Sequence, residues 1–415
     1  MKTYLVGGAV RDALLGRAVT DRDWVVVGAT PAQLLAQGFK AVGHDFPVFL
    51  HPQSQEEYAL ARTERKSGMG YHGFMCDATP VISLEQDLER RDLTINAMAQ
   101  DDKGNIIDPY GGQADLNAKL LRHVSPAFGE DPLRVLRVAR FAARYASLGF
   151  KVAHDTMMLM QNMVKAGELQ HLTAERVWLE THKALTENHP DVYIEVLRES
   201  GALQVLFPEL AQLFGVPQRP EYHPEIDTGV HLLMCLQVAV KNQLNPRTRF
   251  AVLLHDLGKG ITPKDILPRH IGHEARGLPL VQALCARYKV PKDYQQLAEI
   301  VCVYHLECHR VVELQAKTLW HKLQQLDALR RPERFEEFLQ ACKADAQGRL
   351  GWENKPYPQV EYFRQARQVA AAISPKDLTN VSELTGQALG DALSLARIHA
   401  LQQFKKHYQQ EHHDG

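Results

Sequence analysis

The sequence predicts an α+β chain, with a β-rich amino-terminal part followed by a long all-α part. Short runs of β-branched and aromatic residues, such as residues 25–27 and 47–50, alternate with turns up to about residue 125. Amphipathic helical patterns, such as residues 173–180 and 192–197, follow them. The proline-dense stretch at residues 216–224 predicts the main domain boundary. A chain of 415 residues exceeds one typical domain, so we expect two to four.

Composition indicates an ordinary globular protein and argues against an exported or membrane-inserted one. A hydrophobic content of 45% and a charged content of 23% are ordinary for a globular chain, and a net charge of −1 means that any nucleic-acid surface must be local. The six cysteines form no Cys-x-x-Cys pair, which favours a reduced, cytoplasmic protein. The sequence shows no signal peptide and no apolar run of about 18 residues, so we expect neither export nor membrane insertion.

The start of the chain predicts a nucleotide site. An apolar strand runs into Gly7 and Gly8, a helix then opens with Arg11 in its first turns, and a second strand begins with Asp21 and Asp23. Glycines let backbone N–H groups approach a phosphate, and a helix N-terminus favours an anion. Two carboxylates two residues apart on a strand project from one face and can hold divalent cations. Either feature alone is more often a turn or a solvated strand end, but together they predict a metal-dependent triphosphate site.

A second informative stretch begins at Asp131, which precedes Pro132 as a helix N-cap should. The helix that follows places four arginines on one side and apolar residues on the other; these are Arg134, Arg137, Arg140 and Arg144. Such a stripe would face something anionic, whereas a solvated charged face usually carries both signs. Cytosine and adenine both present an amino group beside an unprotonated ring nitrogen. One carboxylate and one guanidinium would therefore accept these two bases and reject uracil and guanine.

The residues Gly7 to Asp12, followed by Asp21-Arg22-Asp23, resemble the active-site signature of the DNA polymerase beta nucleotidyltransferase superfamily. They look most like the class II tRNA nucleotidyltransferases, or CCA-adding enzymes, and the related bacterial poly(A) polymerases. The resemblance implies a polymerase-beta-like head with a small mixed sheet, followed by an all-α neck and body. It also implies template-independent addition of CCA to the 3′ end of tRNA from CTP and ATP.

The same resemblance implies the roles of individual residues. Asp21 and Asp23 would be catalytic and bind Mg²⁺, and a third carboxylate would be Glu57 or its neighbour Glu56, which the sequence does not separate. Phosphates would be held by Gly8, Arg11, Arg91, Arg137 and Arg140. The motif that contains Arg91 continues with Asp92 and Asn96, which would arrange the sugar pocket, while Asp131 and Arg134 would read the base. The glycine-rich residues 63–76 predict a mobile loop, either closing over substrate or idle on the surface.

A different constellation follows the proline-dense stretch. His231 precedes a helical run, and an adjacent His255 and Asp256 close an apolar helix. A lone histidine is more often structural than a ligand, but a buried His-Asp pair costs free energy unless it is paired or binds a metal. Together with Asp345, these residues resemble the His-Asp (HD) metal-dependent phosphohydrolases. The resemblance implies Ni²⁺, Mn²⁺, Co²⁺ or Mg²⁺ at the site and small 2′-phosphate or 2′,3′-cyclic phosphate nucleotides as substrates. Further candidate residues are His270, His273 and His305.

Four domains are therefore expected: a nucleotidyltransferase head at 1–125, a helical neck and body at 126–215, an HD domain at 228–345 and a helical tail at 346–415. We expect a monomer or weak homodimer that binds the tRNA 3′ end and no membrane. One alternative is a poly(A) polymerase, or an enzyme that adds only CC or only A. Alternatives of other classes are an HD phosphohydrolase whose amino-terminal half only binds RNA, and a non-catalytic scaffold.

Overall fold

The structure, a computed structural model, describes residues 1–42, 48–66, 74–378 and 385–413. It divides into two compact units, Met1–Pro208 and Glu209–Gly415. The proline-dense residues 216–224, which the sequence predicts as a linker, lie inside the second unit and fold back on themselves through the bridge between Pro217 and Asp227. The finer division into four domains stays a prediction.

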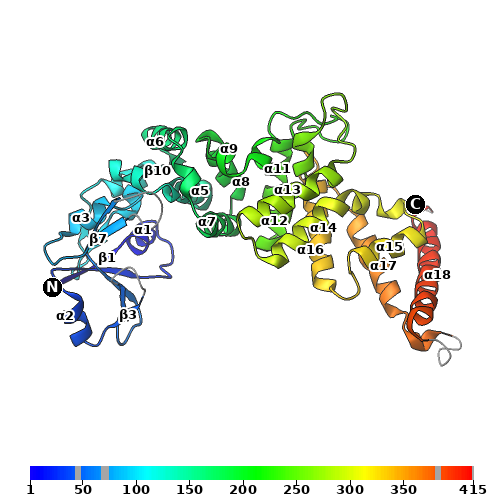
Figure 1. The fold of residues 1–415 in the computed structure, drawn as a ribbon, viewed down its shortest axis with the longest axis horizontal. Helices are drawn as coiled ribbons and strands as arrows, with labels where there is room; N and C mark the ends of the chain where they lie inside the picture. Colours follow the sequence, from blue (N-terminus) through cyan, green and yellow to red (C-terminus); the bar gives the residue numbers. More distant parts are fainter. Residues whose placement is uncertain (43–47, 67–73, 379–384, 414–415) are drawn as a thin grey trace. The chain divides into compact units, whose positions relative to one another are not determined.

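Among the described residues of the first unit, seven strands form one mixed sheet in the order β3-β4-β5-β2-β1-β8-β9. β2 pairs in parallel with β5, and the other neighbours pair antiparallel, so the predicted mixed sheet is confirmed (Figure 1). The strands are β1 (Lys2–Val6), β2 (Asp23–Val27), β3 (Lys40–Val42), β4 (Val48–Leu50), β5 (Glu57–Leu60), β8 (Ala99–Gln100) and β9 (Ile106–Ile107).

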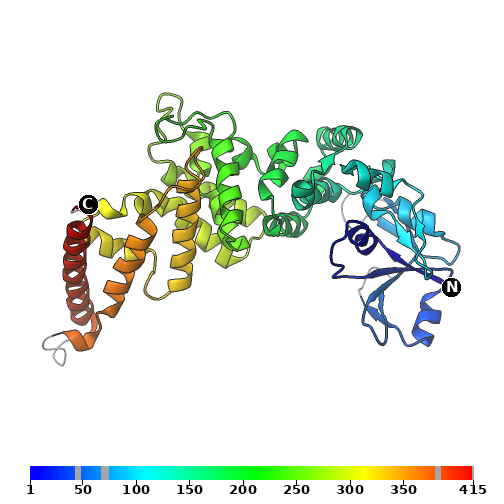
Figure 2. The ribbon, with the colours of Figure 1, turned by 180° about the vertical axis from the view of Figure 1, so that it is seen from behind.

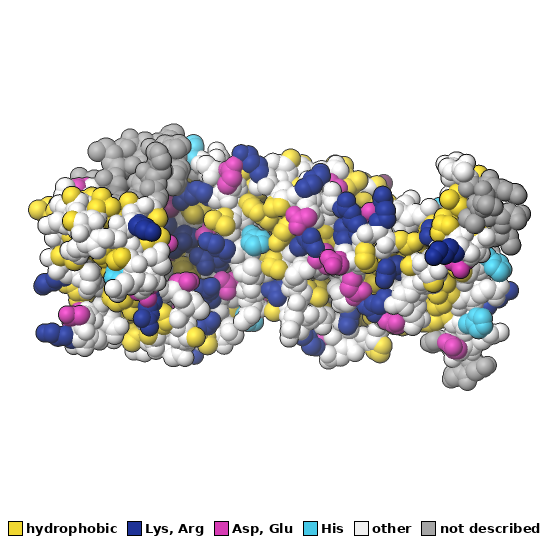
Figure 3. Space-filling view, turned by 90° about the horizontal axis from the view of Figure 1, so that it is seen from below, with side chains coloured by type: hydrophobic (Ala, Val, Ile, Leu, Met, Phe, Trp, Pro, Cys, Tyr) yellow, Lys and Arg dark blue, Asp and Glu magenta, His cyan; other side chains and the backbone are white. Residues whose placement is uncertain are grey.

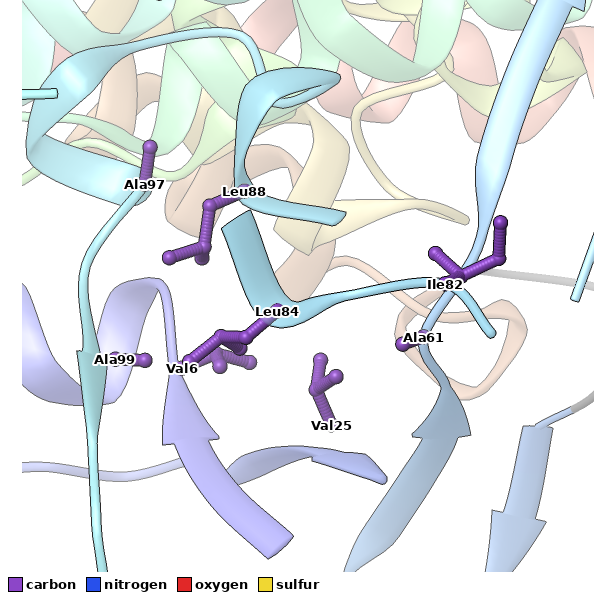
Figure 4. Packing of buried hydrophobic residues seen from close by; sticks show 8 residues of the cluster. All are labelled: Val6, Val25, Ala61, Ile82, Leu84, Leu88, Ala97 and Ala99. Carbon is purple, nitrogen blue, oxygen red and sulfur yellow. The ribbon is translucent and has the colours of Figure 1, made fainter. Parts of the chain in front are cut away.

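Successive side chains of β2 point to opposite faces of the sheet, so apolar residues lie on both faces. Helices cover each face. Val25 belongs to a buried cluster with Val6, into which α3 (Leu84–Glu89) sends Leu84 and Leu88 (Figure 4). Val26 lies in the other cluster, where Leu34 of α2 (Pro31–Ala36) is buried. Capping boxes at Thr30 and Ser83 stabilise the first turns of α2 and α3, the two short helices that pack on the sheet.

The glycine-rich residues 63–76 were expected to form a loop, and this prediction is partly wrong. Their ends pair as the antiparallel strands β6 (Thr63–Lys66) and β7 (Phe74–Asp77). The remaining residues, 67–73, lie outside the described part of the chain, and so does the expected loop motion.

Helices dominate the rest of the first unit, as predicted. The central one, α5 (Leu133–Tyr145), packs against α7 and α8 (Figure 2). A short parallel pair, β10 (Leu120–Leu121) with β11 (Lys151–Val152), is the exception to the all-helical prediction for residues beyond 145. The other helices are α1 (Gly8–Leu14), α4 (Gly112–Ala118), α6 (His154–Lys165), α7 (Ala174–Thr186), α8 (Pro190–Glu199) and α9 (Ala202–Leu206), and the short turns are η2 (Thr94–Asn96), η3 (Pro126–Glu130), η4 (Ala146–Leu148) and η5 (Glu168–His171).

The described residues of the second unit are helical throughout, apart from turns and the isolated bridge at Pro217. Its helices are α10, which starts at Pro208 of the first unit and ends at Ala211, α11 (Thr228–Lys241), α12 (Pro246–Leu254), α13 (His273–Arg287), α14 (Lys292–His309), α15 (Ala316–Gln325), α16 (Pro332–Gln347), α17 (Gln359–Ala372) and α18 (Gly386–His413), with short turns η6 (Leu257–Ile261), η7 (Val311–Glu313) and η8 (Pro375–Asp377). α12 and α14 pack against each other and against α16, which also packs on α11. In neither unit does a described helix combine the length and the apolar character needed to cross a bilayer.

Candidate functional site

A cavity of about 530 Å³ in the first unit collects most of the residues that the sequence singled out. Its lining contains nine arginines and three aspartates, so it suits a polyanion. In Figure 3, Lys and Arg side chains gather in a hollow of this unit. The predicted residues in the lining are Gly8, Arg11, Asp23, Arg91, Asp131, Arg134, Arg137 and Arg140.

The two predicted catalytic aspartates differ in position. β2 begins at Asp23, so Asp21 precedes the strand instead of lying on it as expected. Both residues are exposed, but Asp23 lines the cavity, whereas Asp21 is absent from its lining. Burial raises the pKa of Asp23, Arg91 opposes this rise, and the like charge of Asp21 adds to it. The charged form of Asp23 is therefore disfavoured, and a bound cation would stabilise it.

The sheet register separates the two candidates for a third carboxylate. In the parallel pair of β2 and β5, Asp23 is opposite Glu57, so these side chains emerge on the same face of the sheet. Glu56 precedes Glu57 and accepts a hydrogen bond of 2.9 Å from the indole of Trp24, the neighbour of Asp23. Glu57 is therefore the residue that the register places beside Asp23.

A chain of hydrogen bonds joins α1 to α5 across the cavity. Arg11 donates from Nη1 to Asn96, and Asn96 donates from Nδ2 to Asp92 Oδ1 over 2.9 Å. Asp92 Oδ2 lies 2.6 Å from Arg137 Nη2. Burial alone would raise the pKa of Asp92, but Arg137 and the hydrogen bond from Asn96 hold it well below its usual range. The motif residues Asp92 and Asn96 thus position two cavity arginines.

The arginines of α5 line the cavity, but carboxylates of the protein itself already pair with some of them. The opposite face is buried as expected, and Arg134 and Arg140 are buried as well. Arg140 Nε lies 2.6 Å from Glu180 Oε2, and Arg144 Nε lies 3.0 Å from Glu187 Oε1, both carboxylates coming from or just after α7. The expectation of a purely positive face fails because α7 brings the compensating charges from more than thirty residues away.

Asp131 and Arg134, the expected base readers, are both fixed by the protein. Asp131 Oδ2 lies 2.9 Å from Arg176 Nη2, and Asp131 Oδ1 accepts from the backbone N–H of Leu133. Arg134 donates from Nη1 to the carbonyl of Ala127 and from Nη2 to that of Arg90. These contacts hold the acceptor and the donor in set positions beside the cavity.

The residues predicted as metal ligands in the second unit also lie together. His231 lies on α11, His255 and Asp256 follow α12, and Asp345 lies on α16. Asp345 Oδ1 is 3.0 Å from His231 Nε2 and 3.8 Å from His255 Nε2. His255 Nε2 is 3.1 Å from Asp256 Oδ2. All four are buried, so their polar atoms need partners.

A second group shares one of these ligands. Asp256 Oδ1 lies 3.2 Å from His273 Nε2 and 3.6 Å from His305 Nε2. Burial lowers the pKa of His305 to about 3, so its imidazole is neutral and has a lone pair to offer. His270, the third further candidate, lies outside this group and bonds Thr262 and the carbonyl of Pro217.

Two atoms test whether a cation fits this centre. His255 Nε2 and Asp256 Oδ1 are buried, and none of the polar atoms near them among the described residues has the geometry of a hydrogen bond to them. Burial alone would raise the pKa of Asp256, but His255 and Lys259 hold it well below the ordinary value, so it is ionised. Imidazole nitrogens and carboxylate oxygens within reach of one another suit a divalent cation.

Several residues of both sites were not predicted from the sequence. Cys235 and His309 contact the predicted ligands His231 and Asp345, respectively. Each lies four positions after a histidine that the sequence had singled out, His231 or His305, so helical spacing was the available signal. Arg62, Arg90 and Arg176 line the cavity, and no local pattern marked them.

Family models match both parts of the first unit. "Poly A polymerase head domain" matches residues 3–122, and "Probable RNA and SrmB- binding site of polymerase A" matches residues 149–214. A "Multifunctional CCA protein" of Acinetobacter baumannii is 59% identical over 409 residues, which is 99% of each chain. One of Hahella chejuensis is 60% identical over 98% of this chain and 96% of its own.

Solved structures share the fold along nearly the whole chain. The CCA-adding enzyme of Bacillus stearothermophilus in complex with CTP covers 95% of this chain and 87% of its own, with a TM-score of 0.62 and 26% identity. The CCA-adding enzyme of Thermotoga maritima complexed with tRNA covers 97% of this chain and 90% of its own, with a TM-score of 0.62 and 19% identity.

Proposed function

The chain belongs to the multifunctional CCA proteins, and from this membership we propose which of its residues carry out each activity. It is a multifunctional CCA-adding enzyme, a tRNA nucleotidyltransferase that also has phosphohydrolase activity. Membership of this nucleotidyltransferase family implies metal-dependent catalysis. The observation that carries the assignment of residues is the arginine-lined cavity that contains Asp23.

Asp21 and Asp23 would hold Mg²⁺ for nucleotidyl transfer, with Glu57 as the third carboxylate. The raised pKa of Asp23, the neighbouring charge of Asp21 and the register that sets Glu57 beside them all fit a cation. Magnesium held there would help to deprotonate the 3′-hydroxyl of tRNA and neutralise the leaving pyrophosphate. The protein would contribute Asp23 from the cavity lining, Asp21 from just before β2 and Glu57 from the neighbouring strand.

The triphosphate would be held by the cavity arginines, namely Arg11, Arg91, Arg137 and Arg140, beside the backbone of Gly8. Arg11 and Arg137 are already tied into one hydrogen-bonded chain by Asn96 and Asp92. A positioned guanidinium loses little freedom when it binds phosphate, so the cavity is prepared for CTP and ATP.

The base would be chosen by Asp131 and Arg134. The carboxylate would accept from the amino group of cytosine or adenine, and the guanidinium would donate to the ring edge. Since Arg176 fixes Asp131 and two carbonyls fix Arg134, the protein itself would supply the pattern that a template strand supplies elsewhere. Such a pair discriminates by about 1–3 kcal/mol.

The tRNA 3′ end is the proposed acceptor. The model of an RNA-binding site matches residues 149–214, the helices that follow α5. CCA-adding enzymes of similar fold form complexes with tRNA, CTP and ATP. The expected monomer or weak homodimer stays a prediction.

The function is tested by incubating tRNA that lacks its last three nucleotides with CTP and ATP. We expect a product that stops after CCA, because addition ends when the terminal adenosine is in place. Sequencing the product ends distinguishes the outcomes. An open-ended A tail would indicate a poly(A) polymerase, and a product that stops after CC, or one that gains only A, would indicate a partial enzyme.

The metal centre of the second unit is the proposed phosphohydrolase site, with His231, His255, Asp256 and Asp345 as ligands. Its nitrogen and oxygen donors suit Ni²⁺, Mn²⁺ or Co²⁺, and also Mg²⁺. A divalent cation held there would act as a Lewis acid toward a phosphoester and supply an activated water. Small nucleotides with a 2′-phosphate or a 2′,3′-cyclic phosphate are the proposed substrates.

Gly7 offers a test of the cavity geometry. It has a φ of +68°, and a Cβ added there would lie 2.8 Å from Arg91 Nη1. We expect Gly7→Ala to lower the free energy of unfolding by about 1–3 kcal/mol. Since the Cβ displaces Arg91, we also expect kcat/KM for CTP to fall by about ten- to a hundredfold.

Gly16 provides the matched control. It has a φ of +66°, but a Cβ added there would meet no atom within 4 Å. Gly16→Ala should therefore show a loss of stability in thermal unfolding without the loss of kcat/KM. Equal kinetic losses in both variants would contradict the role given to Arg91.

A further inference from the structure

The folded segment Pro217–Asp227 sends one carboxylate, that of Glu225, to the metal centre. The backbone N–H of Gln218 donates to the carbonyl of Ile226 over 2.7 Å, which closes the segment at its base. Ile226 has a φ of +62°, a conformation that β-branched residues rarely adopt. The neighbouring Glu225 is almost fully buried, with a side chain that is 2% exposed.

Each acceptor atom of Glu225 has a partner. Oε1 forms a hydrogen bond of 2.9 Å with His223 Nδ1 and lies 2.9 Å from His231 Nδ1. Oε2 accepts from the backbone N–H of Leu350, which follows the helix that carries Asp345. The carboxylate therefore joins three segments: its own, the start of α11 and the chain after α16.

His231 differs from the other histidines of the centre. His255, His273 and His305 place Nδ1 within 2.7 to 3.0 Å of the carbonyls of Val252, His270 and Val301, all in the preceding turn. His231 lies at the start of α11, and its shortest Nδ1 contact is the carboxylate of Glu225, with the carbonyl of Gly348 at 3.2 Å. A carboxylate oxygen only accepts, so the Nδ1 that faces Glu225 carries a proton, and the Nε2 that faces Asp345 can bind a cation once that cation takes the place of its own proton.

We infer that Glu225 is a positioning residue of the metal centre: its carboxylate fixes the tautomer and ring orientation of His231, so that Nε2 is presented to the cation. The inference rests on the proposed phosphohydrolase site. A carboxylate behind a ligating imidazole also makes that ligand more basic, which strengthens metal binding. The proline-dense segment is therefore part of the hydrolase centre and not only a connection.

The test measures metal binding by the full-length protein after removal of metal with a chelator. Isothermal titration with Ni²⁺ gives the dissociation constant, and the visible absorption of bound Co²⁺ reports the ligand geometry. We expect Glu225→Ala to weaken Ni²⁺ binding by about 10- to 100-fold. Glu225→Gln keeps an oxygen acceptor but loses the charge, so its affinity should lie between those of Glu225→Ala and the wild type.

Glu221 provides the control, because it belongs to the same segment and its side chain is 62% exposed. Glu221→Gln should bind Ni²⁺ as the wild type does, and all variants should keep the circular dichroism spectrum and the thermal unfolding of the wild type, which shows that the second unit is folded. If Glu225→Ala and Glu225→Gln bind Ni²⁺ as tightly as the wild type, the inference is overturned. If the wild type itself binds no divalent cation, the proposed hydrolase centre fails instead.

Discussion

Replacing Asp23 by asparagine is expected to reduce nucleotide addition to tRNA by about a thousandfold or more. The substitution keeps the shape of the side chain but removes one of the charges that would hold magnesium. Loss of such an interaction costs several kcal/mol in the transition state, and about 4 kcal/mol corresponds to a thousandfold in rate. The measurement is the rate of incorporation of CMP into tRNA at saturating CTP.

Asp102→Asn is the matched control for this change, since Asp102 is an exposed aspartate of the same unit and lies outside the cavity lining. It should retain full activity. Hydrolysis of a 2′,3′-cyclic nucleotide by the Asp23→Asn protein should be unchanged, because the hydrolase ligands all lie beyond Pro208. Normal nucleotide addition by Asp23→Asn would contradict the catalytic assignment and would favour a hydrolase with an RNA-binding module or a scaffold.

Replacing His255 by glutamine and Asp256 by asparagine is expected to abolish phosphohydrolase activity and to leave nucleotide addition intact. Both residues are buried ligands of the proposed centre, and the orphaned atoms His255 Nε2 and Asp256 Oδ1 are lost as metal donors. We expect a decrease of about a thousandfold in Ni²⁺-dependent hydrolysis of 2′,3′-cyclic AMP. Each activity is measured on the same preparation.

The control is His321→Gln, which changes an exposed histidine of α15 in the same unit. Asp256 also pairs with Lys259 at 2.6 Å, so its loss leaves a buried ammonium and can destabilise the unit. His255→Gln alone avoids this effect and should show the same loss of hydrolysis. Loss of nucleotide addition in the His255→Gln protein would show that the two activities are not separable.

How much the sequence predicts depends on how local the determinant is. Gly7, Gly8 and Asp23 form a motif within seventeen residues, and the structure brings all three to one cavity. The apolar face of α5 is equally local and is buried as predicted. The closeness of Gly7, Gly8 and Asp23, and the burial of one face of α5, were predicted from the spacing of residues in the sequence. The roles of these side chains are proposals.

What the sequence does not predict comes from pairs that are distant along the chain. In the sequence, the arginines of α5 resemble an unpaired cationic stripe. In the fold, Arg140 and Arg144 pair with Glu180 on α7 and with Glu187 just after it. Glu225 stands in a stretch whose prolines indicate a linker, and only the tertiary fold carries it to His231. The pairing of β6 with β7 was missed because the glycine content of residues 63–76 is typical of a loop.

The proposed hydrolase centre would also affect the stability of the second unit. Its proposed ligands His231 and Asp345 stand 114 residues apart, on helices at opposite ends of the segment that also carries His255. A cation bound to all of them would act as a reversible cross-link that closes large loops of the unfolded chain. Because such a cation binds the folded form in preference to the unfolded one, the folded population of this unit would rise and fall with the supply of metal around it.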